Sequence, residues 1–225
     1  MIYITGDTHG EAERFTTEYI PFEKELTADD VVIVCGDFGF IFTCDKYEAK
    51  ALDKLSKKPY TICFIDGNHE NFPAIFQYPE ERWCGGRIHR IRDNILHLMR
   101  GQIFEIQGKS VFTFGGAYSM DRCLRTLNET YWLEELPDNS QFKEASDSLK
   151  RYNHKVDIIL THTAPIITIH SMKAYPDAHD LELTGFLDWI YNEVEFSHWY
   201  FGHWHEDLQF NDKIRAVYYD IVKVE

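Results

Sequence analysis

The chain has 225 residues, of which 44% are hydrophobic and 27% charged, so it can form an ordinary globular core. Its formal net charge of -14 argues against broad affinity for nucleic acids, because binding to their backbones needs clustered Lys and Arg. No run approaches the roughly 18 consecutive apolar residues that a membrane-spanning helix needs.

The N-terminal part alternates predicted strands and helices. Apolar runs rich in β-branched residues predict strands, and apolar residues three or four positions apart predict helices. The expected strands are Ile2–Thr5, Val31–Cys35 and Tyr60–Ile65. The expected helices are Glu11–Ile20, Lys46–Lys57 and a short one at Asn71–Gln77. This β-α-β-α-β order predicts a parallel sheet with helices packed against it.

The remainder of the chain is predicted to contain both hairpins and helices. Strands are expected at Ile95–Met99, Ile103–Gln107, Ser110–Phe114, Val156–Leu160 and Trp199–Phe201, followed by a closing hairpin of Leu208–Phe210 and Ile214–Ile221. Helices are expected at Ser140–Tyr152 and Leu183–Val194. A long irregular stretch runs from Gly115 to Asn139, and loops of that length usually carry function or cover a site. No repeat or linker divides the sequence, so residues 1–225 are expected to form a single domain.

The cysteines and the N-terminus favour a cytoplasmic protein. The five cysteines are odd in number and contain no C-x-x-C pair, which favours free thiols over a disulfide framework or a zinc site. The sequence opens on a predicted strand rather than on a leader peptide.

Five short segments place metal-binding side chains at or near the ends of predicted strands. They read Gly-Asp-Thr-His-Gly from residue 6, Gly-Asp from 36, Gly-Asn-His-Glu from 67, Thr-His from 161 and Gly-His-Trp-His from 202. The candidate ligands are Asp7, His9, Asp37, Asn68, His162, His203 and His205. In open α/β sheets the functional edge lies at the carboxyl ends of the strands, so we expect these side chains to meet there.

This set of donors fits two divalent ions that share one carboxylate. Imidazole combined with carboxylate oxygen suits Mn, Fe, Zn, Co or Ni better than calcium. Asp37 can serve as the bridge, because its two oxygens can bind different ions. Two dications with only two carboxylates, Asp7 and Asp37, would carry a net charge of about +2, which attracts an anionic substrate even in an acidic protein.

The order of these motifs, from residue 6 to residue 205, resembles the calcineurin-like metallophosphoesterase superfamily. The resemblance implies an α/β fold with two mixed β-sheets flanked by helices, a four-layered α/β/β/α sandwich. It also implies two groups of ligands. The first metal would be held by Asp7, His9, Asp37 and His205, and the second by Asp37, Asn68, His162 and His203.

The activity that the resemblance implies is binuclear, metal-dependent hydrolysis of a phosphate ester. A hydroxide bridging the metals would attack phosphorus, and His69 would act as the catalytic general acid toward the leaving oxygen. Whether the protein is a phosphatase or a phosphodiesterase stays open, with a diester or nucleotide-like substrate favoured. The rival hypothesis is an inactive binding module on the same scaffold.

The sequence departs from the serine/threonine protein phosphatase branch in its second motif. That branch has an Asp that orients the catalytic His and an Arg that holds phosphate, whereas Gly36-Asp37 continues here as Phe-Gly-Phe-Ile-Phe. A protein phosphatase of that type is therefore disfavoured. Arg122 and Arg125, in the long irregular stretch, are candidates for the missing phosphate contact, and the alternative for each is an ion-paired surface residue.

Several further side chains have weaker assignments. The aromatic residues of the motif loops and the irregular stretch are candidates to stack a nucleobase, with core packing as the alternative. They are Phe38, Phe40, Tyr118, Tyr131, Trp132 and Trp204. We interpret Asp66 as a turn residue, with orientation of His69 as the alternative. We interpret Glu70 as a charge that favours the N-terminus of the short helix after it, with a catalytic role as the alternative.

Overall fold

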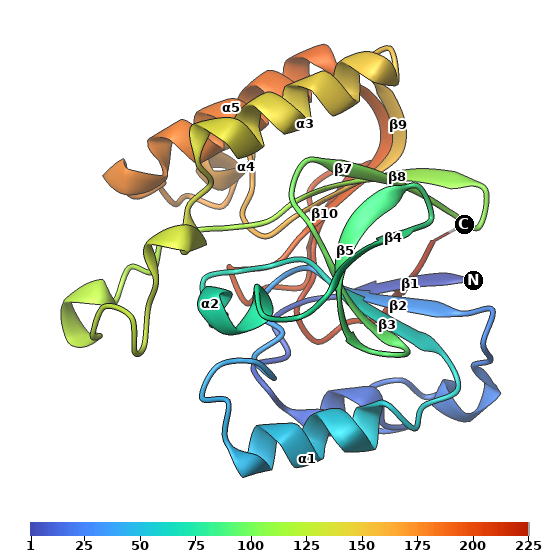
Figure 1. Ribbon diagram of the computed structural model, residues 1–225. Helices are drawn as coiled ribbons and strands as arrows, with labels where there is room; N and C mark the ends of the chain where they lie inside the picture. Colours follow the sequence, from blue (N-terminus) through green and yellow to red (C-terminus); the bar gives the residue numbers. More distant parts are fainter. Residues whose placement is uncertain (225) are drawn as a thin grey trace.

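The protein was analysed as a computed structural model that describes residues 1–224, in which two β-sheets pack face to face (Figure 1). The first sheet has the strand order β13-β1-β2-β3-β6-β5-β4. Its strands are β1 (Ile2–Thr5), β2 (Val31–Val34), β3 (Thr61–Phe64), β4 (Glu80–Trp83), β5 (Gly86–Arg92), β6 (Ile95–Leu98) and β13 (Val222–Lys223). The four central strands β1, β2, β3 and β6 are parallel, and the outer strands are antiparallel to their neighbours.

The second sheet is also mixed, with the order β11-β12-β10-β9-β8-β7. Its strands are β7 (Gln102–Ile106), β8 (Lys109–Phe114), β9 (Lys155–Thr161), β10 (Glu195–Phe201), β11 (Leu208–Gln209) and β12 (Ile214–Ala216). The strands β8, β9, β10 and β12 are parallel, whereas β7 and β11 pair in antiparallel fashion at the two edges. The predicted closing hairpin is present as β11 and β12, although its second strand is shorter than expected.

Helices cover the outer faces of both sheets (Figure 1). The helix α1 (Lys46–Leu55) lies against the first sheet, while α3 (Asn139–Arg151), α4 (Ile166–Ser171) and α5 (Leu181–Glu193) lie over the second; the short α2 (Phe72–Ile75) follows β3 in the chain. Polar caps fix two of the helix starts: Asp45 accepts hydrogen bonds from the backbone at the start of α1, and Asp138 forms a capping box at the start of α3. The predicted α/β/β/α sandwich is confirmed.

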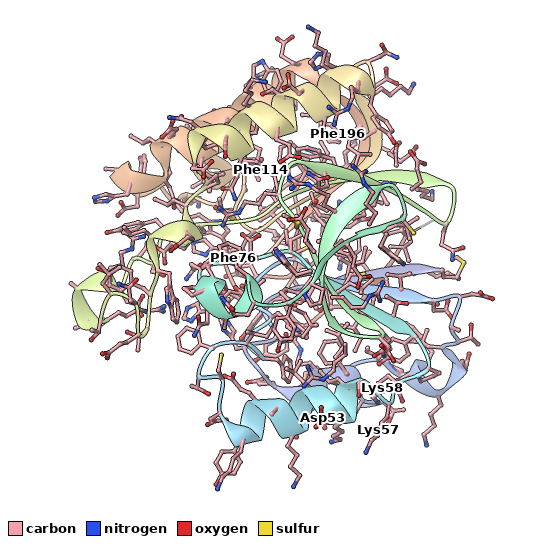
Figure 2. The ribbon with its side chains drawn as sticks, in the orientation of Figure 1. Asp53, Lys57, Lys58, Phe76, Phe114 and Phe196 are labelled. Carbon is pink, nitrogen blue, oxygen red and sulfur yellow. The ribbon has the colours of Figure 1, made fainter. Side chains whose placement is uncertain are left out.

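Layers of apolar side chains hold the sandwich together. Between the sheets, buried residues such as Ile33 from β2 and Leu160 from β9 belong to one cluster. Phe114 and Phe196 belong to the layer between the second sheet and its helices (Figure 2). Because β1 and β2 are buried along their whole length, their sequences are almost continuously apolar.

The predicted helix at Glu11–Ile20 was wrong. Only Ala12–Phe15 is helical, as a short 3-10 turn, and the backbone becomes extended at Thr16. Phe15 is buried as expected, but Arg14 beside it is also buried and donates hydrogen bonds to the carbonyl oxygens of Gly6 and Asp7. Arg14 is thus held by tertiary contacts with the loop after β1 rather than exposed on the polar face of a helix.

All five cysteines are free thiols. Within residues 1–224, no helix has both the length and the apolar character needed to cross a bilayer.

The irregular stretch between Gly115 and Asn139 is anchored by one buried arginine. Arg100 is 5% exposed, and its Nε donates to Asp66 Oδ2 at 2.7 Å. Its Nη2 donates to the carbonyl oxygens of Glu134 and Glu135 at 2.9 and 3.2 Å. Asp66 is therefore a buried ion-pair partner rather than a simple turn residue. Burial disfavours its charged form, but Arg100 and His97 outweigh burial and lower the pKa of Asp66 to about 2.

Arg100→Ala should destabilise the protein by roughly 3–5 kcal/mol, because it leaves the carboxylate of Asp66 buried without a partner. Equilibrium unfolding in urea measures this change. The exposed Arg82 on β4 provides the control, since Arg82→Ala should change stability by no more than about 0.5 kcal/mol. A loss below about 1 kcal/mol for Arg100→Ala would show that this pair does not anchor the stretch.

Candidate metal centre

The seven candidate ligands lie together at the carboxyl ends of strands from both sheets. Asp7 and His9 follow β1, Asp37 follows β2, Asn68 follows β3, His162 follows β9 directly, and His203 and His205 follow β10. Because β1, β2 and β3 are parallel in one sheet, and β9 and β10 in the other, their ends open toward one shared edge of the sandwich.

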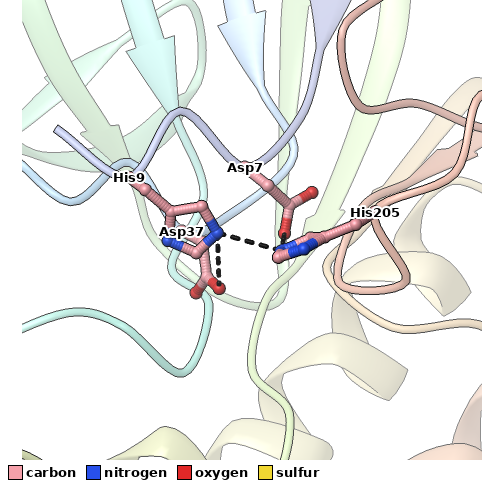
Figure 3. A group of neighbouring side chains, drawn as sticks. All are labelled: Asp7, His9, Asp37 and His205. Atoms are coloured by element: carbon pink, nitrogen blue, oxygen red, sulfur yellow. Dashed lines mark hydrogen bonds and ion pairs between the residues drawn. The ribbon is translucent and has the colours of Figure 1, made fainter. Parts of the chain in front are cut away.

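Four of these side chains converge on one point (Figure 3). Asp7, His9, Asp37 and His205 each offer a ligand atom, and these atoms all lie within 4.8 Å of one another. The Nε2 atoms of His9 and His205 are 3.0 Å apart. His205 Nε2 is also 3.7 Å from Asp7 Oδ1, and His9 Nε2 is 3.9 Å from Asp37 Oδ2. Two imidazole nitrogens and two carboxylates facing one point fit a divalent transition metal.

A second group lies on the other side of Asp37. His162 Nε2 is 3.1 Å from Asn68 Oδ1 and 3.3 Å from Asp37 Oδ1. The opposite ring nitrogen, Nδ1 of His162, donates to the carbonyl oxygen of Cys35 at 2.8 Å, an arrangement that leaves Nε2 as the ligand atom. The rings of His203 and His162 have centroids 5.0 Å apart. A Cβ at Gly67 would collide with Oδ1 of Asp37, so only glycine allows this approach.

Asp37 thus presents a different oxygen to each group. Its Oδ2 faces His9, while its Oδ1 faces His162 and accepts a hydrogen bond from the backbone N–H of His69 at 2.8 Å. The carboxylate is 2% exposed and lies between the two groups. These are the contacts required of a ligand shared by two ions.

The backbone at the centre is strained. Positive φ angles of 45–67° occur at five of the seven candidate ligands, namely Asp7, His9, Asp37, His203 and His205. Each non-glycine residue in this region costs on the order of 1–3 kcal/mol, and such residues cluster at functional sites. The backbone conformation that directs these side chains toward one another is therefore destabilising in itself, and the sequence pattern does not reveal it.

Burial and charge leave most of the imidazoles neutral, the form that binds metals. Burial lowers the pKa of His9 to about 4 and the pKa of His203 to about 3. Burial also opposes the charged form of His162, but the carboxylate of Asp37 outweighs it and raises the pKa of His162 to about 10. A cation bound at Nε2 of His162 would take the place of that proton.

Glu70 links two of the ligand loops, a role that the sequence analysis missed. Its Oε1 accepts from the backbone N–H of Phe38 at 2.7 Å, and its Oε2 accepts from that of Gly67 at 2.9 Å. Our interpretation of Glu70 as a helix-favouring charge was wrong, because Asn71 caps α2 and Glu70 is 1% exposed. Burial raises the pKa of Glu70 to about 8. The only available signal was its place directly after Gly-Asn-His.

His69 lies at the mouth of the centre, outside both groups. Its Nε2 is 4.0 Å from Asp37 Oδ2 and 2.8 Å from Nη2 of Arg125. The Nε of Arg125 is paired with Asp121 at 2.8 Å. A cavity of about 380 Å³ opens here, lined by Asp37, Asn68, His69, Met120, Asp121, Arg125, His203, Trp204 and His205.

Arg122, the other candidate for a phosphate contact, is not among the residues that line this cavity. Its Nε donates to Glu135 Oε1 at 2.7 Å, and its guanidinium lies 4.4 Å from the centroid of the Tyr118 ring. Of the two arginines, the structure therefore brings only Arg125 to the candidate site.

Three of the six aromatic candidates for stacking a base are not accessible. Phe38, Phe40 and Trp132 are at most 2% exposed, and Phe38 stacks on Phe64 with centroids 4.4 Å apart. For these three residues, the nucleobase hypothesis was wrong and core packing is their role. Trp204 remains as an aromatic side chain that lines the cavity.

Comparisons with known proteins agree with this geometry. The family model described as calcineurin-like phosphoesterase matches residues 1–207. The chain belongs to the calcineurin-like phosphoesterase family. A search of curated proteins found no match. The fold resembles the crystal structure of a phosphopantetheinyl hydrolase from Mycobacterium tuberculosis, with a TM-score of 0.51, 15% identity, and coverage of 96% of this chain and 87% of that one. Family membership supports the expected activity of a phosphoester hydrolase.

Proposed function

We propose that this calcineurin-like phosphoesterase is a binuclear, metal-dependent enzyme that hydrolyses a phosphate mono- or diester. The observation that carries the proposal is the position of Asp37, whose two oxygens face two separate groups of ligands. One group contains the four side chains that converge within 4.8 Å, and the other contains Asn68, His162 and His203.

The protein residues would hold the ions and leave the cavity side open to substrate. Asp7, His9, Asp37 and His205 would hold the first ion; Asp37, Asn68, His162 and His203 would hold the second. When bound, the two ions supply an activated water and neutralise the charge on the phosphoryl group. The physiological metal would come from the series Mn, Fe, Zn, Co or Ni, which suits these ligands.

Arg125 would bind the phosphate by its guanidinium. In the structure, Nη2 of Arg125 contacts Nε2 of His69, and both side chains line the cavity. An incoming phosphate offers oxygens that match the guanidinium better than an imidazole nitrogen does. Binding would therefore move the hydrogen bonds of Arg125 from His69 to the substrate.

The same exchange would prepare His69 to act as an acid. Burial lowers the pKa of His69, the carboxylate of Asp37 opposes that shift, and the charge of Arg125 adds to it. A phosphate anion placed between Arg125 and His69 would act in the opposite direction and favour the protonated imidazole. His69 could then hold a proton at Nε2 and donate it to the leaving oxygen.

The organic part of the substrate would lie against Met120 and Trp204. Both line the cavity, and Met120 is 72% exposed, which leaves apolar surface beside the phosphate site. This surface fits the organic group of a monoester or the second ester group of a diester. A nucleotide-like substrate would use Trp204 to stack its base.

Hydrolysis by metal-stripped protein, reloaded separately with each candidate metal, tests the proposed function. Nitrophenyl phosphate and bis-nitrophenyl phosphate distinguish a monoesterase from a diesterase. Hydrolysis of at least one of them should appear only after reloading. A protein that binds metal and yet cleaves neither ester would support the binding-module alternative instead.

Arg125→Ala should lower kcat by at least about tenfold, or roughly 1.4 kcal/mol, with metal content unchanged. The reason is that a bidentate contact that strengthens in the transition state affects turnover, whereas charge steering alone affects substrate capture and depends on salt. Steady-state kinetics on the better ester, combined with elemental analysis, measure both quantities.

Arg90 on β5 provides a matched control for Arg125. It is also an arginine held by one carboxylate, Glu81 at 2.7 Å, but it lies outside the cavity lining. Arg90→Ala should keep the wild-type kcat. A near-normal kcat for Arg125→Ala would return Arg125 to the role of an ion-paired surface residue.

A further inference from the structure

A chain of buried hydrogen bonds runs from one candidate ligand into the irregular stretch. The Nδ2 of Asn68 donates to Oγ of Ser119 at 3.1 Å, and Oγ of Ser119 donates to Oε2 of Glu135 at 2.9 Å. Asn68, Ser119 and Glu135 are 4%, 1% and 0% exposed, so solvent does not replace these contacts. None of the roles described above requires Ser119 or Glu135.

The carboxylate at the far end gives this chain a direction. An ionised carboxylate can only accept, so the single hydroxyl hydrogen of Ser119 points to Glu135. The lone pairs of the hydroxyl then face Asn68, and only the NH₂ end of the amide can meet them. The opposite end of the amide, Oδ1, consequently faces His162 Nε2 at 3.1 Å.

This orientation decides which atom Asn68 presents to an ion. The amide oxygen is a metal ligand, whereas the NH₂ group of an amide is a donor and carries no lone pair to offer. A flipped Asn68 would have almost the same shape but would turn its NH₂ group toward Nε2 of His162. Packing alone does not distinguish the two orientations, and hydrogen bonding does.

Glu135 is itself fixed by three donors. Its Oε1 accepts from the backbone N–H of Ser119 at 2.8 Å and from Nε of Arg122 at 2.7 Å, in addition to the Ser119 hydroxyl on Oε2. Arg100 also donates to its backbone carbonyl oxygen. The carboxylate therefore has one position, and Arg122 supplies the opposite charge that a buried carboxylate needs.

We propose that Ser119 and Glu135 are positioning residues that orient the Asn68 amide toward the metal centre, with Arg122 acting on Glu135. The inference rests on the proposed function, because it assigns Asn68 to a metal. It gives Arg122 a role different from that of Arg125: one arginine supports a metal ligand, and the other contacts the substrate.

Calorimetric titration of the metal-stripped protein with Mn²⁺ tests the inference, because it measures metal affinity and not activity. Ser119→Ala should weaken one of the two Mn²⁺ equivalents by roughly 10–100-fold, the usual effect of losing a residue that orients a ligand, and should leave the other unchanged. Glu135→Gln should weaken the same equivalent, because it places an NH₂ donor where Ser119 needs an acceptor.

The same Ser119→Ala substitution in an Asn68→Asp variant distinguishes loss of amide orientation from a packing defect. In Asn68→Asp both ends of the side chain are oxygens, so orientation no longer matters, and adding Ser119→Ala should have little further effect on Mn²⁺ affinity. An equal loss in the Asn68 and Asn68→Asp backgrounds would overturn the inference, since a packing defect acts in both.

The remaining controls keep the outcomes distinct. Ser148 on α3 is 3% exposed and its Oγ accepts from Arg151, so Ser148→Ala removes an equally buried hydroxyl away from the centre and should retain both equivalents. If the wild type and Ser119→Ala both bind two equivalents of Mn²⁺ tightly, the positioning role is refuted and the binuclear proposal is not. One equivalent or none in the wild type would instead refute the binuclear proposal.

Discussion

Replacing Asp37 by asparagine should abolish hydrolysis and remove metal from both halves of the centre. We expect the rate to fall by at least about 10⁴-fold, which corresponds to roughly 5.4 kcal/mol of lost transition-state stabilisation. The substitution keeps the shape of the side chain, so its effect reports on charge and on ligand atoms rather than on packing.

The size of the effect follows from the two oxygens of Asp37. Burial disfavours a charge at this position, yet the neighbouring imidazole of His162 outweighs it and holds the pKa of Asp37 well below the usual range of a carboxyl. Asparagine removes that charge and leaves one oxygen for two ions. Loss of any other ligand would disturb a single ion, whereas loss of this one disturbs both.

Asp30→Asn provides the matched control for Asp37→Asn. Asp30 is also buried, at 9% exposed, but it precedes β2 and pairs with the N-terminal amine at the opposite end of that strand. Metal content by elemental analysis and hydrolysis should both match the wild type in this control. Retention of one full metal equivalent by Asp37→Asn would show that the carboxylate is not shared.

His69→Ala should keep both metal equivalents and lower turnover by roughly 10²–10⁴-fold, as expected for loss of a general acid. The imidazole lies 4.0 Å from Asp37 Oδ2 and is not part of either ligand group. The loss should shrink for esters with good leaving groups such as nitrophenolate, because these need little protonation. Turnover of a series of aryl esters with increasing leaving-group pKa measures this dependence.

A matched histidine control is available in His170 on α4, which contacts Tyr175 and lies outside the cavity lining. His170→Ala should leave turnover unchanged for every ester in the series. Loss of metal from His69→Ala would show that His69 is a ligand. An equal loss of rate for good and poor leaving groups would contradict the role of general acid.

The convergence of the candidate ligands could be predicted from the sequence because each of them lies close to the end of a strand. Val31–Val34 and Thr61–Phe64 are apolar runs of strand length, and each motif follows within a few residues of its strand. Parallel pairing then brings sequence-distant motifs to one edge, so a one-dimensional pattern specifies a three-dimensional cluster.

Other parts of the fold gave no such signal. The strands Glu80–Trp83 and Gly86–Arg92 were not predicted, because β4 is a charged edge strand and the inward positions of β5 include His89, which pairs with His97 at 3.0 Å. Both strands lie in consecutive hairpins, since β4 pairs with β5 and β5 pairs with β6. Because the buried position of His89 in β5 is polar, the strand lacks the usual alternation of apolar and polar residues that predicts a strand.

The residues that contact the candidate ligand Asn68 could not be predicted from the sequence either. Ser119 contacts Asn68, and Glu135 contacts Ser119, only because the irregular stretch folds back over the centre; the Asn68–Ser119 contact spans 51 positions. Nothing in the local sequence distinguishes Glu135 from the exposed Glu134 beside it. The positive φ angles of the ligands are likewise imposed by tertiary structure, since Asp and His do not specify them.

Titration of metal-stripped protein with Mn²⁺, monitored by the initial rate of ester hydrolysis, tests the central claim most directly. The account predicts that hydrolysis reaches its plateau at two equivalents of metal per chain and that the stripped protein is inactive. A plateau at one equivalent, or hydrolysis that persists without metal, would contradict it.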